Sequence, residues 1–256
     1  MQFAEFEESM VINMTEKEFI ENYDVTKYER LSVTVDTLIF SVNEDMKLEI
    51  LLKQRDDFPF KDKWCIPGGF VGINESLDEA ANRVLKEKTG AEDLFLEQLY
   101  TFGAVDRDPR MRVITVTYTA MVPKAKVKLQ AENASWFIID DFDNCILKKS
   151  TSDKEIFLSG DDLGFDHSEI IQMAIKRIQG KLEYTDIAFE LLNDKKRFAI
   201  YELQKIHEAI RGKELDTANF KRYVTNNYIN SGRMVQTSEQ CREFSKRPSW
   251  YYRLEE

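Results

Sequence analysis

The sequence predicts a mixed α/β domain followed by a small, mainly helical domain that ends in a β-hairpin. Strand-like segments rich in β-branched residues alternate with amphipathic helical segments as far as about residue 183, and helical spacing prevails after it. The charge changes near the same place. Residues 195–254 hold 13 basic and 6 acidic side chains, a balance of +7, whereas residues 1–194 carry −15. We therefore expect two domains, 1–183 and 184–256, with separate roles.

The composition is that of a folded cytoplasmic protein without a membrane span. Hydrophobic residues make up 43% of the chain, which is ample for a packed core. The longest apolar stretches, such as residues 33–42, are far shorter than the roughly 20 residues that a bilayer requires. The first thirty residues are acidic, unlike a signal peptide. The cysteines and histidines are too few and scattered for a disulfide framework or a metal cluster: Cys65, Cys145, Cys241, His167 and His207.

The first domain is expected to contain an N-terminal helix within residues 1–30, since residues 15–18 form a capping-box pattern. Residues 75–89 predict an amphipathic helix that Gly90 ends. A bridging helix over 168–183, capped by Ser168, would lead to the second domain. The polar segment 153–166 is expected to be a surface insertion. Strands are expected at residues 31–42, 48–52, 94–102, 112–122 and 135–139.

The second domain shows the order of elements of a winged helix-turn-helix. Three short helices, at 187–192, 200–210 and 216–225, precede a hairpin with a long tip. The third helix has the length of a recognition helix, and its basic and amide side chains suit phosphates and base edges. The alternative is a helical dimerisation appendage with a solvated basic face. The DNA-binding residues expected on the helix and the wing tip are Asn219, Lys221, Arg222, Asn226, Arg242, Lys246 and Arg247.

The motif with the clearest chemical meaning begins at Gly69 and continues through Glu75, Arg83, Glu87 and Gly90. This spacing resembles the Nudix box, G-x5-E-x7-R-E-U-x-E-E-x-G-U, where U is aliphatic. The resemblance implies an α/β/α sandwich with a mixed sheet. It also implies hydrolysis of nucleoside diphosphates linked to another moiety, with Mg²⁺ or Mn²⁺ bound by glutamates of the box helix. Two of the box residues, Glu75 and Arg83, would then fix loop and helix.

The box of this chain departs from the family pattern at two metal-binding positions. Val84 and Lys88 stand where the family places glutamates, so that Glu87 alone remains. Two unit charges about 4 Å apart interact by roughly 4 kcal/mol at an effective dielectric of 20, so an ammonium group strongly opposes a divalent ion. We therefore expect that no cofactor is required. Catalysis would need Glu87 as catalytic residue and metal ligand, Mg²⁺ or Mn²⁺, and a carboxylate from residues 140–143.

A second polar cluster lies at residues 106–110, with the sequence Asp-Arg-Asp-Pro-Arg. Arginine forks bind phosphate well, and aspartate oxygens suit sugar hydroxyls. The alternative is a charged hairpin turn with internal salt bridges. For Lys88, the two readings are a solvated lysine and a ligand for an anionic group. The ligand-binding residues that we expect are Arg55, Gly69, Lys88, Asp106, Arg107, Asp108 and Arg110.

The order of the two domains resembles the Nudix-related transcriptional regulators, which fuse a Nudix domain to a C-terminal winged helix. The specific points are residues 31–36, 106–110, 201–204 and 219–222. The resemblance implies a homodimer that binds palindromic operator DNA and senses a small-molecule effector, either a nucleotide sugar such as ADP-ribose or a pentose. Some members hydrolyse ADP-ribose, so a divergent Mg-dependent hydrolase is the alternative. A third possibility is a ligand-binding protein whose second domain contacts another protein.

Overall fold

The computed structural model describes residues 14–90, 94–129, 132–151, 154–241 and 249–255, and the chain divides into two compact units between Ser32 and Val33. In the smaller unit, helix α2 (Glu16–Glu21) begins with the predicted capping box, in which Thr15 and Glu18 exchange hydrogen bonds. This is the helix expected within residues 1–30. Within 14–30 only α2 is α-helical, because Asn22 ends it and Asp24 folds a turn with Thr26. No helix in the described ranges could cross a bilayer.

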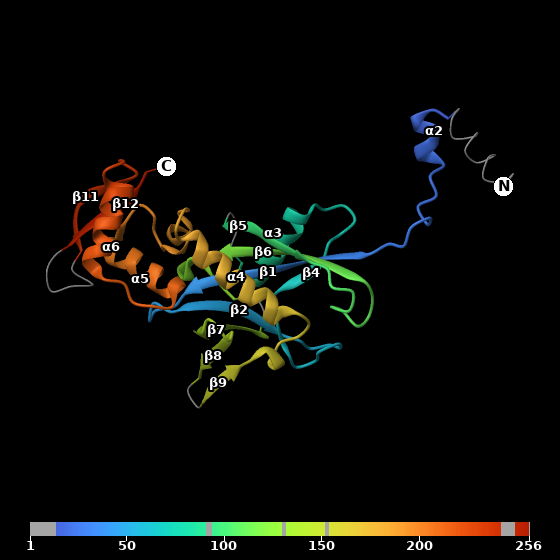
Figure 1. Cartoon of the computed structure of the whole chain (residues 1–256), viewed down its shortest axis with the longest axis horizontal. Coiled ribbons are helices and arrows are strands. Elements are labelled where there is room, and N and C mark those ends of the chain that lie inside the picture. The colour runs from blue at the N-terminus through green and yellow to red at the C-terminus, as the bar shows by residue number, and fades with distance from the viewer. Residues whose placement is uncertain (1–13, 91–93, 130–131, 152–153, 242–248, 256) are drawn as a thin grey trace. The chain divides into compact units, whose positions relative to one another are not determined.

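A sheet of nine strands in the described residues forms the centre of the larger unit (Figure 1). Its main path follows the order β5–β6–β1–β2–β7–β8–β9, while β3 pairs with β2 and β4 with β1. The five strands predicted from the sequence are confirmed as β1, β2, β5, β6 and β7. The strands are β1 (Ser32–Val42), β2 (Leu48–Gln54), β3 (Trp64–Cys65), β4 (Gly68–Phe70), β5 (Phe95–Phe102), β6 (Val113–Met121), β7 (Ala134–Asp141), β8 (Ile146–Ser150) and β9 (Glu155–Leu158).

Two helices cover opposite faces of this sheet, α3 (Leu77–Thr89) and α4 (His167–Lys181). Successive side chains of a strand point to opposite faces, and β1 shows this directly. Leu38 and Phe40 pack in the same cluster as the buried face of α4, whereas Val35 packs with Val84 of α3. The predicted α/β/α sandwich is therefore confirmed. A short 3₁₀ turn, η1 (Lys124–Lys126), follows β6.

The box helix α3 begins at Leu77, two residues later than predicted, because Ser76 is its N-cap, and it ends at Thr89 as predicted. Ser76 accepts a hydrogen bond from the backbone N–H of Glu79, whose carboxylate accepts from the N–H of Ser76. Gly90 ends the helix in the left-handed region, at φ 66°. The predicted amphipathic pattern is confirmed: Ala80, Ala81, Val84 and Leu85 form an apolar stripe that is at most 2% exposed, and Leu77 beside it is partly buried.

The prediction of a surface insertion over residues 153–166 is wrong. Its described part forms β9, which pairs antiparallel with β8, and the 3₁₀ turn η2 (Gly160–Asp162). Leu158 and Leu163 are each 5% exposed and belong to the main core. The segment looked polar because polar residues surround this four-residue strand, three of whose residues are apolar. Helix α4 starts at His167 after Asp166, so Ser168 is not its N-cap.

The remainder of the larger unit is the predicted winged helix-turn-helix. Its three-stranded sheet has the order β10–β12–β11. Asp216 caps helix α6 by accepting a hydrogen bond from the N–H of Asn219, and Phe220 and Val224 of this helix are buried. The elements are η3 (Ile187–Leu191), β10 (Phe198–Ala199), α5 (Ile200–Arg211), α6 (Thr217–Val224), a π-helical turn (Thr225–Ile229), β11 (Met234–Cys241) and β12 (Ser249–Leu254).

Helix α4 joins the sheet to the winged helix through polar and apolar contacts. The Gln179 side chain donates a hydrogen bond to the carbonyl of Ile210 at 3.1 Å, and Arg211 pairs with Glu183 at 2.7 Å. The core that contains Ile171 and Ile175 of α4 also contains buried residues of α5 and α6. One apolar core therefore runs from the main sheet into the winged helix.

Candidate functional site

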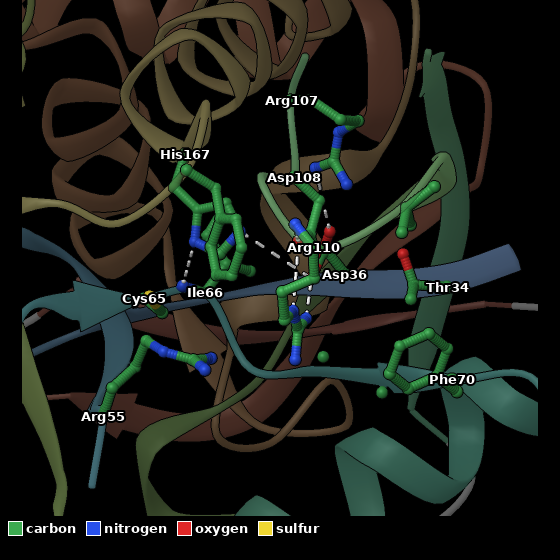
Figure 2. Close-up of a pocket in the computed structure, with 14 residues that line it drawn as sticks. Thr34, Asp36, Arg55, Cys65, Ile66, Phe70, Arg107, Asp108, Arg110 and His167 are labelled. Carbon is green, nitrogen blue, oxygen red and sulfur yellow. Dashed lines mark hydrogen bonds and ion pairs between the residues drawn. The ribbon is translucent and has the colours of Figure 1, made fainter. Parts of the chain in front are cut away.

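A pocket of about 220 Å³ opens where the start of α4 meets β1, β4 and the turn before β6 (Figure 2). We call it the arginine pocket, since three arginines line it. Five of the ligand-binding residues predicted from the sequence meet here. The lining residues are Thr34, Asp36, Arg55, Cys65, Ile66, Gly68, Gly69, Phe70, Arg107, Asp108, Arg110, Val113, Phe165 and His167.

The other predicted ligand residues are not among those that line this pocket. Asp106 is exposed in the turn before the buried Arg107. Lys88 lies partly buried near the end of α3. Glu87 is exposed, and its carboxylate lies 3.5 Å from Nη1 of Arg83. The structure therefore brings together the arginines and the turn, but not the polar side chains at the end of the box helix.

Arg110 and Arg55 supply the accessible positive charge of the arginine pocket. Nε and Nη2 of Arg110 donate to the two oxygens of Asp108 at 3.0 and 2.8 Å, and this pairing holds the pKa of Asp108 below its ordinary value. Nε of Arg55 donates to the carbonyl of Pro59 at 2.7 Å, and its guanidinium lies 5.1 Å from the ring of Phe165. Figure 2 shows both guanidinium groups directed into the pocket from different walls. Two fixed guanidinium groups suit a phosphate or diphosphate.

Arg107 is held quite differently, because its side chain is only 4% exposed. Its Nε and Nη2 donate to Oδ2 and Oδ1 of Asp166 at 2.9 and 2.7 Å, and Nη2 lies 3.8 Å from Asp36. The alternative prediction, a turn with internal salt bridges at residues 106–110, therefore holds for the pair of Arg110 and Asp108. It does not describe Arg107, which reaches the residue before α4.

Two further polar residues of the pocket, Asp36 and His167, were not predicted as ligand residues. Asp36 is 7% exposed and accepts a hydrogen bond from the Thr115 hydroxyl at 2.7 Å. Nδ1 of His167 accepts from the backbone N–H of Ile66 at 2.9 Å, so Nε2 carries the proton of the neutral ring, 3.9 Å from Asp36. Burial lowers the pKa of His167 and keeps the ring neutral. A lone aspartate in the apolar strand 33–42 was the signal for Asp36; no local signal pointed to His167.

Gly68 is required by its close approach to β1. A Cβ at this position would lie 2.1 Å from Oδ1 of Asp36 and 2.8 Å from the carbonyl oxygen of Val35. We expect Gly68→Ala to lower the free energy of unfolding by about 1–3 kcal/mol, because the backbone of β1 would have to move. Urea denaturation measures this. The matched control is Gly69→Ala, whose Cβ would meet its nearest neighbours at an ordinary 3.6 and 3.7 Å; equal losses in both variants would contradict the steric argument.

The box residues fix the loop before α3, as the resemblance implied for them. Nε of Arg83 donates to Glu75 at 3.0 Å, and the same carboxylate accepts from the N–H of Gly72 at 2.7 Å. The hydrogen bond from Arg83 and, to a smaller extent, the bond from Gly72 lower the pKa of Glu75 to about 2. Both charged groups are therefore engaged in holding the loop to the helix.

The residues at the box helix do not fit a divalent cation. The Val84 side chain is 1% exposed, and its Cγ2 lies beneath Gly69, 3.6 Å from where a Cβ would be. Glu87 faces Arg83, and Lys88 adds a further positive charge to the last turn. The Asp141 carboxylate, one of the alternatives, accepts the N–H groups of 143 and 144 in its own turn. Over the described residues, no group of three or more His, Cys, Asp or Glu side chains could hold a metal.

The predicted DNA-binding residues of the recognition helix share its exposed face. Phe220 and Val224 anchor the opposite face in the domain core, and Nη2 of Arg222 donates to Asn219 at 2.8 Å. The predicted wing-tip residues Arg242, Lys246 and Arg247 lie outside the described residues. The exposed residues are Asn219, Lys221 and Arg222 on α6 and Asn226 in the π-helical turn that follows it.

Known proteins share both halves of this architecture. Residues 32–158 match the NUDIX domain family, and residues 188–254 match the family described as the NrtR DNA-binding winged helix domain. The "ADPR responsive transcriptional repressor NtrR" of Acinetobacter baylyi is 34% identical over 252 residues, which cover 96% of this chain and 91% of that protein.

Two solved structures resemble nearly the whole chain. A MutT/nudix family protein from Enterococcus faecalis is 32% identical, with a TM-score of 0.76 and 98% of each chain covered. NrtR of Shewanella oneidensis, in complex with a 27mer DNA, is 29% identical, with a TM-score of 0.70; 87% of this chain and 93% of that one are covered.

Proposed function

The chain belongs to the Nudix-related transcriptional regulators, and on this basis we propose that it is an effector-responsive regulator that binds operator DNA. Its first domain would sense the effector and its winged helix, 184–256, would read the DNA. Such a protein acts in the cytoplasm and needs neither metal nor another cofactor for this role.

The arginine pocket is the observation that carries the effector proposal. Arg55 and Arg110 offer guanidinium groups for a diphosphate, while Asp36 and Asp108 offer carboxylate oxygens for sugar hydroxyls. A nucleotide sugar has both kinds of group. ADP-ribose is the first candidate, since the repressor from A. baylyi responds to it by name.

The winged helix would place α6 in the major groove. Lys221 and the wing-tip cations would bind phosphates, whereas Asn219, Arg222 and Asn226 would read base edges. NrtR of S. oneidensis, which resembles this chain, was solved in complex with DNA, and this supports DNA binding by the winged helix.

We further propose a homodimer, which suits palindromic DNA. The smaller unit supports this, because seven large apolar side chains between residues 14 and 31 are exposed, and such clusters mark interaction surfaces. They are Met14, Phe19, Ile20, Tyr23, Val25, Tyr28 and Leu31.

Fluorescence anisotropy on the full chain tests this function. The probe is a labelled duplex from the region upstream of its own gene, titrated at several salt concentrations with and without ADP-ribose. We expect sequence-preferring, salt-sensitive binding whose affinity changes when ADP-ribose is added. Absence of such binding would end the proposal.

The alternative, a divergent hydrolase, is tested on the same protein. ADP-ribose is incubated with Mg²⁺ or Mn²⁺, and released AMP is measured. Brisk turnover that Glu87→Gln abolishes would establish the alternative. The buried Val84 and the Glu87–Arg83 pair argue against it.

A further inference from the structure

The carboxylate of Asp166 is held by Arg107 although it stands where a helix cap belongs. An aspartate at this position normally accepts a hydrogen bond from a backbone N–H of the first helical turn, which stabilises the helix. Asp216 makes this bond in α6. Asp166 makes no such bond in α4, and its two oxygens accept hydrogen bonds from Arg107 instead.

The backbone at Asp166 differs from that of the residues that cap other helices. Asp166 has a ψ of 19°, whereas the capping residues Thr15, Ser76 and Asp216 have ψ values of 156°, 168° and 122°. Cap geometry at Asp166 would require this torsion to change by more than 100°. The preceding residue, Phe165, has a φ of 56°, which is unfavourable for a side chain of this size. Its relaxation would accompany the rotation.

The Arg107–Asp166 ion pair forms part of the wall of the arginine pocket. Arg107 lines the pocket, and so do the residues on both sides of Asp166, Phe165 and His167. The second carboxylate beside Arg107, that of Asp36, lies farther away at 3.8 Å. An anionic group that enters the pocket meets Arg55 and Arg110, and it can reach the largely buried Arg107 only in competition with Asp166.

The other end of α4 contacts the winged helix. Gln179 donates to the last turn of α5, and Arg211 of α5 pairs with Glu183. Between these ends, Ile171, Ile175 and their neighbours pack in the core that α5 and α6 share. A shift at the first turn of α4 is thus carried by a packed helix to the element that supports the recognition helix.

We propose that the Arg107–Asp166 ion pair is the latch through which the effector controls the winged helix. A phosphate of the effector draws Arg107 away, and the released Asp166 carboxylate turns to cap α4. The movement of α4 then changes the placement of α5 and α6. This inference rests on the proposed function and names its regulation.

Asp166→Asn tests the latch in the full chain, because asparagine caps helices as well as aspartate does but forms no ion pair. The coupling is the ratio of operator Kd values with and without saturating ADP-ribose, and 5- to 150-fold is typical of allosteric proteins. We expect this ratio to fall below about 2 in the variant, because the latch is already open. We also expect ADP-ribose, measured by calorimetry, to bind about 5-fold more tightly, because its competitor for Arg107 has gone.

Glu169→Gln is the matched control, since it removes an exposed negative charge from the same helical turn. It should keep the coupling of the wild type. Asp166→Ser, another good cap without charge, repeats the test if the asparagine variant does not fold. Unchanged coupling in the Asp166 variants overturns the latch, and so does weaker ADP-ribose binding, which indicates a purely structural pair. A wild-type chain that does not bind the DNA, or does not respond to ADP-ribose, contradicts the proposed function instead.

Discussion

Replacement of Arg222 by alanine is expected to weaken operator binding about 10- to 100-fold. Its side chain lies on the exposed face of α6, where Asn219 orients the guanidinium through a 2.8 Å hydrogen bond. A bidentate contact with a base contributes about 1–3 kcal/mol and discriminates against other bases. Anisotropy titrations against the operator and against single-base variants measure both effects. A relaxed preference at one base position would identify the base that Arg222 reads.

Arg177→Ala is the matched control for this experiment. Arg177 is an exposed arginine on α4, so its loss changes the net charge equally without touching α6. We expect its operator affinity to stay within about 2-fold of the wild type at physiological salt, because exposed charges beyond about 8 Å are screened. A comparable loss in both variants would show that overall charge, not a contact of α6, determines binding.

Arg110→Ala should weaken ADP-ribose binding about 10- to 100-fold. The fork between Arg110 and Asp108 fixes the guanidinium at the pocket wall, and a charge-assisted hydrogen bond to a phosphate is worth about 1.5–3 kcal/mol. Isothermal titration calorimetry measures the affinity. The response of operator binding should shift to correspondingly higher ADP-ribose concentrations.

Arg112→Ala controls for the loss of an arginine from the same turn. Its guanidinium donates to the carbonyls of Gly103 and Ala104 at 2.8 and 2.7 Å, and it does not line the arginine pocket. We expect ADP-ribose affinity close to that of the wild type. If Arg112→Ala loses as much affinity as Arg110→Ala, the turn itself, and not a direct contact, is what the ligand requires.

Features that depend on neighbouring residues were predictable from the sequence. The caps at Thr15 and Asp216, the end of α3 at Gly90 and the apolar stripe of α3 follow from side chains within one or two turns. Five of the nine described strands of the main sheet followed from their apolar pattern, as in β1, whereas β3, β4 and β8 were not predicted. Edge strand β9 was not predicted either, because it is only four residues long and polar residues surround it.

The arginine pocket could be predicted only in part, for the same reason. The 106–110 turn and Arg55 are recognisable by their chemistry alone. The partner of Arg107 lies 59 residues away, and His167 meets Ile66 across 101 residues, so neither pairing leaves a local pattern. Lys88 was predicted as a ligand residue because it stands where the Nudix family places a metal-binding glutamate. A position on the box helix does not by itself bring a side chain to the pocket, and the pocket of this chain lies beside β1 and α4.

One apolar core runs from the main sheet through α4 into α5 and α6, and this affects any attempt to separate the winged helix from the Nudix domain. A winged helix cut from the chain would expose part of this shared core, to which Leu203, Ile206 and Ile210 of α5 belong, and would tend to aggregate. On heating, the Nudix domain and the winged helix should therefore unfold together in one cooperative transition. A fusion of this winged helix to another ligand-binding domain would have to include α4.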